Sequence, residues 1–166
     1  HGHGAGDAVL TEMRNRLSPL FRATDHLVRW GGEEFLVVAR ATTRERVAEL
    51  AERVCSAVRS TPFALPDGTH LQRTCSVGAA CLPFDPRRAE AFTWQDVLDL
   101  ADQALYAVKQ SGRDGWAMLS AAQEAAPLSA NIRNVRLAVT TGQMLLTGSR
   151  EAEALTSALQ ETLSEA

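Results

Sequence analysis

The chain has few cysteines, and they are not arranged as a disulfide framework or a zinc site. Only Cys55, Cys75 and Cys81 occur in 166 residues, and no CxxC pair is present. An odd number of cysteines without paired spacing argues against both kinds of cross-link. We therefore expect reduced thiols in the core of a cytoplasmic domain.

An excess of positive charge and long apolar runs are also missing. Seventeen Lys+Arg stand against twenty Asp+Glu, a formal net charge of −3, which excludes a generally basic protein that coats DNA or RNA. No apolar run approaches the ~20 residues of a membrane-spanning helix. The sequence opens at His1 without a methionine or a signal peptide, so we expect a segment of a longer protein.

What is present is the composition of an ordinary globular domain. The hydrophobic fraction is 45% and the charged fraction 22%, which argues against disorder or a fibrous repeat. This length suffices for one domain with an appendage. Because Ala, Ser and Pro dominate from Ser120 onward, we predict a domain over residues 1–119 and a C-terminal extension over 120–166.

Hydrophobic periodicity and turn residues predict alternating helices and hairpins. The predicted helices cover residues 7–20, the segment from a Thr42–Glu45 capping box to Pro62, and the segment from a Thr93 cap to Gly112. The predicted strands are 26–30 and 35–39 around a Gly31-Gly32 turn, a second hairpin at Asp67-Gly68 with a strand over 74–81, and a closing strand over 116–119. This order predicts an α/β (α+β) fold with an antiparallel component. In the extension, 131–146 is ambiguous and 149–166 reads as an amphipathic helix.

A glycine turn followed by two acidic residues is the most informative segment. Gly31 and Gly32 let the backbone come close to a ligand, and Glu33 and Glu34 follow directly. Since side chains alternate along a strand, these carboxylates are expected to point to opposite faces, so only one lines a given site. A carboxylate beside such a turn suits a Mg²⁺-bound triphosphate. Taken alone, the segment is more typical of a surface hairpin with solvated glutamates.

Two further pairs of charged residues have both a functional and a structural interpretation. Lys109 and Arg113 are four residues apart, so on a helix they share a face and can grip phosphates, or else they complement the helix dipole. Arg22 and Asp25, three apart, form either a ligand site or a weak surface ion pair.

Five segments in order resemble the motifs of the GGDEF family, the diguanylate cyclases that make cyclic di-GMP from two GTP molecules. They are Gly2-His-Gly-Ala-Gly-Asp7, Arg22-Ala-Thr-Asp25, Gly31-Gly-Glu-Glu-Phe35, Thr74-Cys-Ser-Val-Gly-Ala79 and Asp102 to Arg113. The resemblance covers about residues 1–119. It implies a palm-like, mostly antiparallel sheet flanked by helices, with a C-terminal helical extension.

The resemblance also implies roles for individual residues. Glu33 would bind Mg²⁺ (or Mn²⁺), with Glu34 in support, and these are the expected catalytic residues. Substrate contacts are implied for Asp7 with the guanine, for Gly31 and Gly32 with the nucleotide, and for Lys109 and Arg113 with the phosphates. An inhibitory site for the product cyclic di-GMP is implied for Arg22, Asp25 and Arg53.

Complete family members carry, before the point where this chain begins, a central strand with a metal-binding aspartate and a guanine-contacting asparagine. We therefore expect little cyclase activity from this segment alone and activity in the parent protein. The missing strand belongs to the parent, to another chain, or is replaced by the stretch around Val135–Val139.

The leading hypothesis is a diguanylate cyclase domain, expected to act as a homodimer after an upstream sensory domain. Its expected location is the cytoplasm, free or as part of a membrane-anchored protein. The alternative is a catalytically incomplete domain that serves as a cyclic di-GMP receptor, and a third class is an oligomerisation domain that uses the 149–166 helix.

Overall fold

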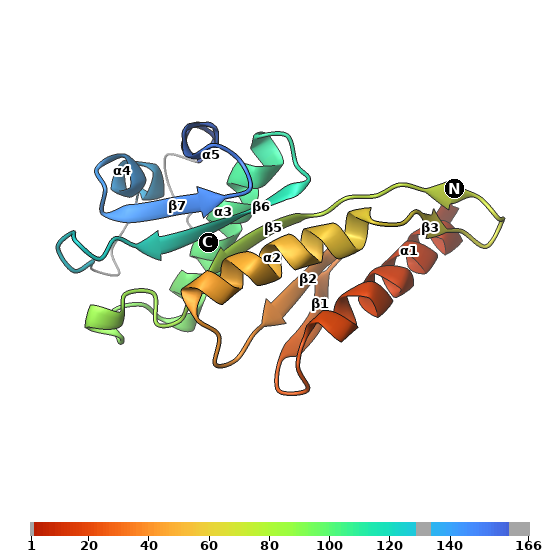
Figure 1. The fold of residues 1–166 in the computed structure, drawn as a ribbon, viewed down its shortest axis with the longest axis horizontal. Helices are drawn as coiled ribbons and strands as arrows, with labels where there is room; N and C mark the ends of the chain where they lie inside the picture. Colours follow the sequence, from red (N-terminus) through yellow and green to blue (C-terminus); the bar gives the residue numbers. More distant parts are fainter. Residues whose placement is uncertain (1, 129–133, 160–166) are drawn as a thin grey trace. The chain divides into compact units, whose positions relative to one another are not determined.

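The computed structural model describes residues 2–128 and 134–159, with side chains from Gly4 onward. The chain forms two compact units, His1–Cys75 and Ser76–Ala166. Helices and strands alternate in both (Figure 1). Three of the four strand pairings in the described residues are antiparallel, which confirms the predicted mixed fold with a mostly antiparallel sheet.

The first unit combines two helices with two short hairpins. Its elements are α1 (Gly2–Leu17), a 3₁₀ turn (Ser18–Leu20), β1 (His26–Gly31), β2 (Glu34–Val38), α2 (Arg44–Arg59), β3 (Phe63–Ala64) and β4 (His70–Leu71). The first predicted hairpin is confirmed, since β1 pairs with β2. A hairpin is also present around Asp67-Gly68, but its strands are β3 and β4, and the strand expected over 74–81 does not belong to it. Helix α1 begins before its predicted start at Asp7.

The N-terminus of α2 is capped, but not by the predicted capping box. The Thr43 side chain accepts a hydrogen bond from the Arg46 amide, as an N-cap residue does. A capping box needs Glu or Gln at the position of Arg46. Arginine cannot return that bond, so α2 has the cap without the box.

A small core joins α1 to the end of α2, and Arg16 ties them further. Leu17, Val58 and Phe63 are buried together. The Arg16 guanidinium lies over the Phe63 ring at 3.8 Å and donates to the carbonyls of Val58 (3.1 Å) and Pro62 (2.8 Å). Because its donors are satisfied and its plane packs on an aromatic ring, Arg16 supports the core although it is charged.

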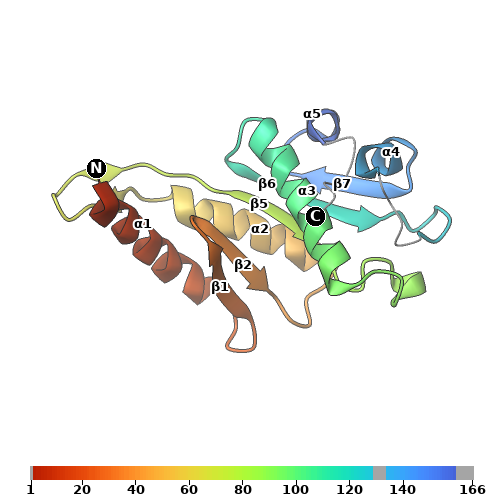
Figure 2. The same cartoon turned by 180° about the vertical axis from the view of Figure 1, so that it is seen from behind.

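The second unit is a three-stranded sheet with helices. Its elements are β5 (Ser76–Ala80), a 3₁₀ turn (Pro86–Arg88), α3 (Trp94–Gln110), β6 (Gly115–Ala121), α4 (Val135–Thr140), β7 (Met144–Gly148) and α5 (Ala152–Ala158). The strand order is β5-β6-β7, with β5 parallel and β7 antiparallel to β6. Helix α3 makes the crossover between the two parallel strands and runs across them (Figure 2).

Local signals set both ends of α3, as predicted. Thr93 and Asp96 form a reciprocal capping box at its start. At its end Gly112 takes a φ of +110°, and the Arg113 amide returns to the Val108 carbonyl at 2.9 Å.

Gly78 of β5 lies directly under α3. A Cβ atom there would be 2.1 Å from the Ala101 carbonyl oxygen and 2.3 Å from the Leu105 nitrogen, both backbone atoms of the helix. Only glycine lets α3 approach β5 this closely. The glycine of the Thr74–Ala79 motif is therefore a packing requirement.

The extension is partly built into this sheet, which changes three expectations. Strand β6, expected to close the sheet, lies in its middle because β7 pairs with its other edge. The stretch around Val135–Val139, one of the candidates for the missing strand, is helical and forms most of α4. The expected helix over 149–166 is limited in the described residues to α5, and residues 160–166 lie outside the described part.

The extension also contributes to the core of the second unit. Leu128, Val135, Met144, Leu146, Leu155 and Leu159 are buried in one cluster with the inner face of α3. Along β7, Met144 and Leu146 are buried whereas Leu145 and Thr147 are exposed. This period of two turns one face of the strand toward the core.

Candidate functional site

The acidic turn of the β1–β2 hairpin lies one residue later than predicted. Gly31 is paired with Glu34, so Gly32 and Glu33 are the two central residues of the turn. Gly32 takes a φ of +48°, the conformation that a primed hairpin turn needs at its first central position. The register shift between Arg29 and Gly31 leaves Trp30 as an extra residue on β1.

The position of the turn separates the two glutamates. Glu33 belongs to the turn and only Glu34 belongs to the strand, so strand alternation does not decide where Glu33 points. Both side chains are exposed. In the part of the chain that the structure describes, the Glu33 carboxylate has no hydrogen bond or ion pair. It is therefore open to a ligand at the tip of the hairpin.

Two neighbours shape the turn. Arg29 Nε donates to the Gly32 carbonyl at 2.9 Å and braces the loop from within the hairpin. Arg29 was not among the predicted site residues, although it lies only two residues before Gly31. A Cβ atom at Gly31 would meet nothing within 4 Å, so the protein itself does not require glycine there.

The donor set fits a metal ion shared with a phosphate ligand rather than a closed protein cage. Among residues 2–128 and 134–159, no group of three or more His, Cys, Asp or Glu side chains is placed to hold a metal. Mg²⁺ is commonly held by one or two carboxylates together with substrate phosphates and water. Glu33 and Glu34 are adjacent and exposed, so their residue types fit that minimal protein contribution.

Asp25 has a structural role in addition to any role in binding. Its carboxylate accepts hydrogen bonds from the backbone N–H groups of Arg22 (2.8 Å) and Arg40 (2.9 Å). These bonds lower the pKa of Asp25, the Arg22 amide having the largest effect. The hydrogen bond between Arg22 and Asp25 thus comes from the backbone amide of Arg22. The side chain of Arg22 is exposed. Arg53 is exposed on α2.

Lys109 and Arg113 do not share a helix face, contrary to prediction. Lys109 lies in the last turn of α3, but the helix ends at Gln110 and Gly112 turns the chain away. Arg113 follows in the left-handed region, with a φ of +56° and an exposed side chain. The remaining predicted contact, Asp7, is exposed on α1. Within the first unit, the Gly31–Glu34 turn lies at the tip of the β1–β2 hairpin, whereas the Arg22/Asp25 loop lies at its base, next to Arg40.

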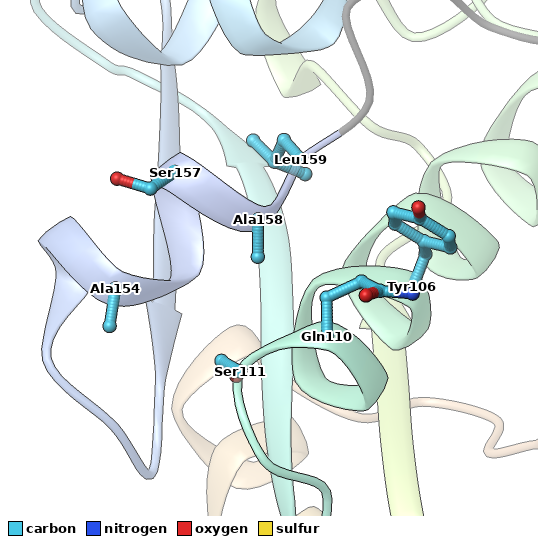
Figure 3. A pocket seen from close by; sticks show the side chains of 7 residues that line it. All are labelled: Tyr106, Gln110, Ser111, Ala154, Ser157, Ala158 and Leu159. Atoms are coloured by element: carbon cyan, nitrogen blue, oxygen red, sulfur yellow. The ribbon is translucent and has the colours of Figure 1, made fainter.

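A separate pocket lies in the second unit, between the end of α3 and α5. Figure 3 shows Tyr106 and Gln110 on α3 and Ala154, Ser157 and Ala158 on α5. The pocket that they line has a volume of about 520 Å³. The complete lining is Tyr106, Gln110, Ser111, Ala154, Ser157, Ala158 and Leu159. It contains none of the predicted site residues.

The family model described as "Diguanylate cyclase, GGDEF domain" matches residues 1–115. The chain belongs to the GGDEF family. The match includes the acidic turn of the β1–β2 hairpin, and it ends where β6 begins. Strand β7 and helices α4 and α5 therefore lie outside the part of this GGDEF protein that the family model describes.

Relatives of this GGDEF chain include named diguanylate cyclases. It is 40% identical over 113 residues to diguanylate cyclase DgcP of Pseudomonas aeruginosa, covering 68% of this chain and 16% of that protein. It is 34% identical over 114 residues to diguanylate cyclase A of Treponema denticola, covering 69% of this chain and 29% of that protein. The chain thus spans less than a third of either relative.

A solved GGDEF domain has the same fold. The GGDEF domain of YfiN (TpbB) from Pseudomonas aeruginosa is 30% identical, with a TM-score of 0.60, over 68% of this chain and 67% of that one. Across the described residues, no helix of the GGDEF chain combines the length and apolar character needed to cross a membrane.

Proposed function

We propose that this GGDEF chain is the catalytic domain of a diguanylate cyclase, which condenses two GTP molecules into cyclic di-GMP. The observation that carries the proposal is Glu33, an exposed carboxylate without a protein partner in the described residues, at the tip of a turn inside the matched family region. The open space at Gly31 supports it, because a nucleotide can approach the backbone there.

Glu33 would hold Mg²⁺ (or Mn²⁺), with Glu34 in a supporting position. When bound, the metal would offset triphosphate charge and lower the pKa of the attacking 3′-hydroxyl. Asp7 would accept hydrogen bonds from the guanine N–H groups, and Lys109 and Arg113 would bind the phosphates. Since each protomer would hold one GTP, synthesis would require a homodimer. This domain would act in the cytoplasm, and an upstream sensory domain in the parent protein would control it.

Cyclic di-GMP would inhibit the enzyme through Arg22, Asp25 and Arg53. The exposed Arg22 guanidinium can fork onto guanine O6 and N7 or onto phosphate. Each Asp25 oxygen accepts one backbone bond and keeps capacity for another. The same residues would serve the alternative function, a cyclic di-GMP receptor without catalysis. That alternative is favoured because, within the described residues, no third His, Cys, Asp or Glu side chain is placed to join Glu33 and Glu34 around a metal.

The test uses the full-length protein with Mg²⁺-GTP and measures both cyclic di-GMP synthesis and cyclic di-GMP binding. Glu33→Gln keeps the size of the side chain and removes its charge, and we expect a loss of synthesis of about 100-fold or more. Product binding should be unchanged in this variant. Arg22→Ala should show the reverse, with synthesis retained and product binding lost.

Glu49→Gln is the matched control, because Glu49 is an exposed glutamate on α2 outside the proposed site. It should affect neither measurement. If the wild-type protein binds cyclic di-GMP but does not synthesise it, the receptor function is correct and the cyclase function is wrong. If the wild-type protein does neither, the proposal is overturned.

A further inference from the structure

The loop after α3 has an unusual backbone. Gly112, Arg113 and Asp114 take φ values of +110°, +56° and +47°, so three consecutive residues lie in the left-handed region. Glycine adopts it readily, but Arg and Asp pay a steric penalty there. Two such residues in succession persist only where surrounding contacts hold them.

Arg150, which follows β7 in the extension, makes such contacts. Its Nη2 donates a hydrogen bond to the Arg113 carbonyl. Its guanidinium also lies against Gly112, where an added Cβ would be 3.5 Å from Nη2 and 3.7 Å from Cζ. Arg150 Nε is buried and has no hydrogen-bond partner in the described part of the chain, so the guanidinium is held by its contacts with this loop.

Ser149 makes hydrogen bonds at the C-terminal end of the same loop. Its Oγ accepts a hydrogen bond from the Trp116 amide at 2.9 Å, and its own amide donates to the Trp116 carbonyl at 3.0 Å. A Cβ atom at Gly115 would lie 2.4 Å from Ser149 Oγ. The extension therefore contacts the loop at both ends, while the Arg113 amide is bonded to α3.

We propose that Arg150 is a positioning residue for phosphate recognition. It fixes the backbone of Arg113 by bonding its carbonyl, so that the exposed Arg113 guanidinium is presented to a triphosphate in one orientation. This inference rests on the proposed function, in which Arg113 contacts GTP. The family match ends at residue 115, so Arg150 lies in the extension, outside the part of the chain that the family model describes.

The test measures loop dynamics and ligand affinity in the full-length protein. Hydrogen exchange of residues 112–116 reports the loop, and calorimetric titration with Mg²⁺ and the α,β-methylene analogue of GTP reports the affinity. Arg150→Ala should speed exchange and weaken binding by about tenfold, as expected for residues in contact. Arg150→Lys keeps a donor and should recover part of the affinity.

A double-mutant cycle separates positioning from general stability. If Arg150 acts through Arg113, then Arg150→Ala has no further effect on affinity in an Arg113→Ala background. Glu151→Gln, at the exposed neighbouring residue, should change neither measurement. An equal loss of affinity in both backgrounds, or unchanged exchange in Arg150→Ala, would overturn the role of Arg150. Failure of the wild-type protein to bind the analogue would instead overturn the proposed function, and exchange would still decide whether Arg150 holds the loop.

Discussion

Arg87 holds the buried carboxylate of Asp85 with two side-chain hydrogen bonds of 2.8 Å, from Nε to Oδ1 and from Nη2 to Oδ2. The same carboxylate accepts the Leu128 amide at 3.2 Å, and Arg87 Nη1 donates to the Gln123 carbonyl at 2.7 Å. This pair therefore joins the loop after β5 to the first part of the extension. Asp85 is only 1% exposed, so its bonds replace water almost completely.

The ion pair between Asp85 and Arg87 is expected to make the stability of the fold depend on pH. The Arg87 side chain holds the pKa of Asp85 well below its usual range. A carboxylate with a depressed pKa in the folded state stabilises the fold above its unfolded pKa, about 3.9, and loses that contribution as the pH falls toward the folded value. At pH 7, Asp85→Asn should lower the free energy of unfolding by about 2–4 kcal/mol.

Urea unfolding of both proteins at pH 7, 5 and 3 checks this prediction. The difference between wild type and Asp85→Asn should be equal at pH 7 and 5 and smaller at pH 3. Glu90→Gln, at an exposed acid near the same loop, should show no such difference. A gap of constant size at all three pH values would contradict the role of the Asp85 charge.

The extension is predicted to stabilise the second unit through its buried leucines. Leu155 on α5 is 0% exposed, and its truncation to alanine should cost about 2–5 kcal/mol. Leu137 on α4 is 57% exposed, and Leu137→Ala should change stability by less than about 0.5 kcal/mol. Denaturant unfolding measures both, and similar values for the two variants would show that α5 does not belong to the core.

The two glycines of the acidic turn are predicted to behave differently. Gly32→Ala should lower stability by about 1 kcal/mol, because alanine is strained at a φ of +48°. Gly31→Ala should leave the melting temperature unchanged, since nothing lies within 4 Å of the new methyl group. If a nucleotide lies against Gly31, this variant should nevertheless bind GTP about tenfold more weakly. Unchanged affinity for GTP in Gly31→Ala would argue that the nucleotide does not approach this residue.

Arg22 is predicted to be the cleaner probe of product inhibition. Arg22→Ala keeps the backbone N–H that bonds to Asp25, so the loop should stay intact while inhibition by cyclic di-GMP is lost. Asp25→Ala removes the acceptor for both Arg22 and Arg40, so it should abolish inhibition and also speed exchange of those two amides. Inhibition curves and hydrogen exchange on the same samples separate the two effects. Inhibition that persists in Arg22→Ala would rule out this site.

Local features of the fold could be predicted because their causes lie within a few residues. Thr93 and Asp96 satisfy the first amides of α3 by themselves, and Gly112 ends the helix by its own conformational freedom. The β1–β2 hairpin was also predicted, but the two residues at the centre of its turn were not. Cross-strand pairing and the extra residue at Trp30 decide that Gly32 and Glu33 are central.

Residues whose role depends on distant partners could not be predicted. The Asp85 carboxylate is bonded to Leu128, and Arg150 is bonded to Arg113, across 43 and 37 positions of sequence. No periodicity or spacing signals such pairs. The same holds for Arg16, whose donors reach the carbonyl of Val58 in the last turn of α2 and that of Pro62 just after the helix.

The sequence by itself determined the family and the order of its motifs, the two ends of α3 and the turns of the two hairpins to within one residue, because each depends on neighbouring residues and their intrinsic backbone preferences. Only the tertiary structure decided that the extension adds a strand to the sheet, that Arg113 leaves the helix of Lys109, and that Arg150 holds its loop. These outcomes depend on hydrogen bonds and packing between segments far apart in the chain, which form only when the sheet and its helices come together.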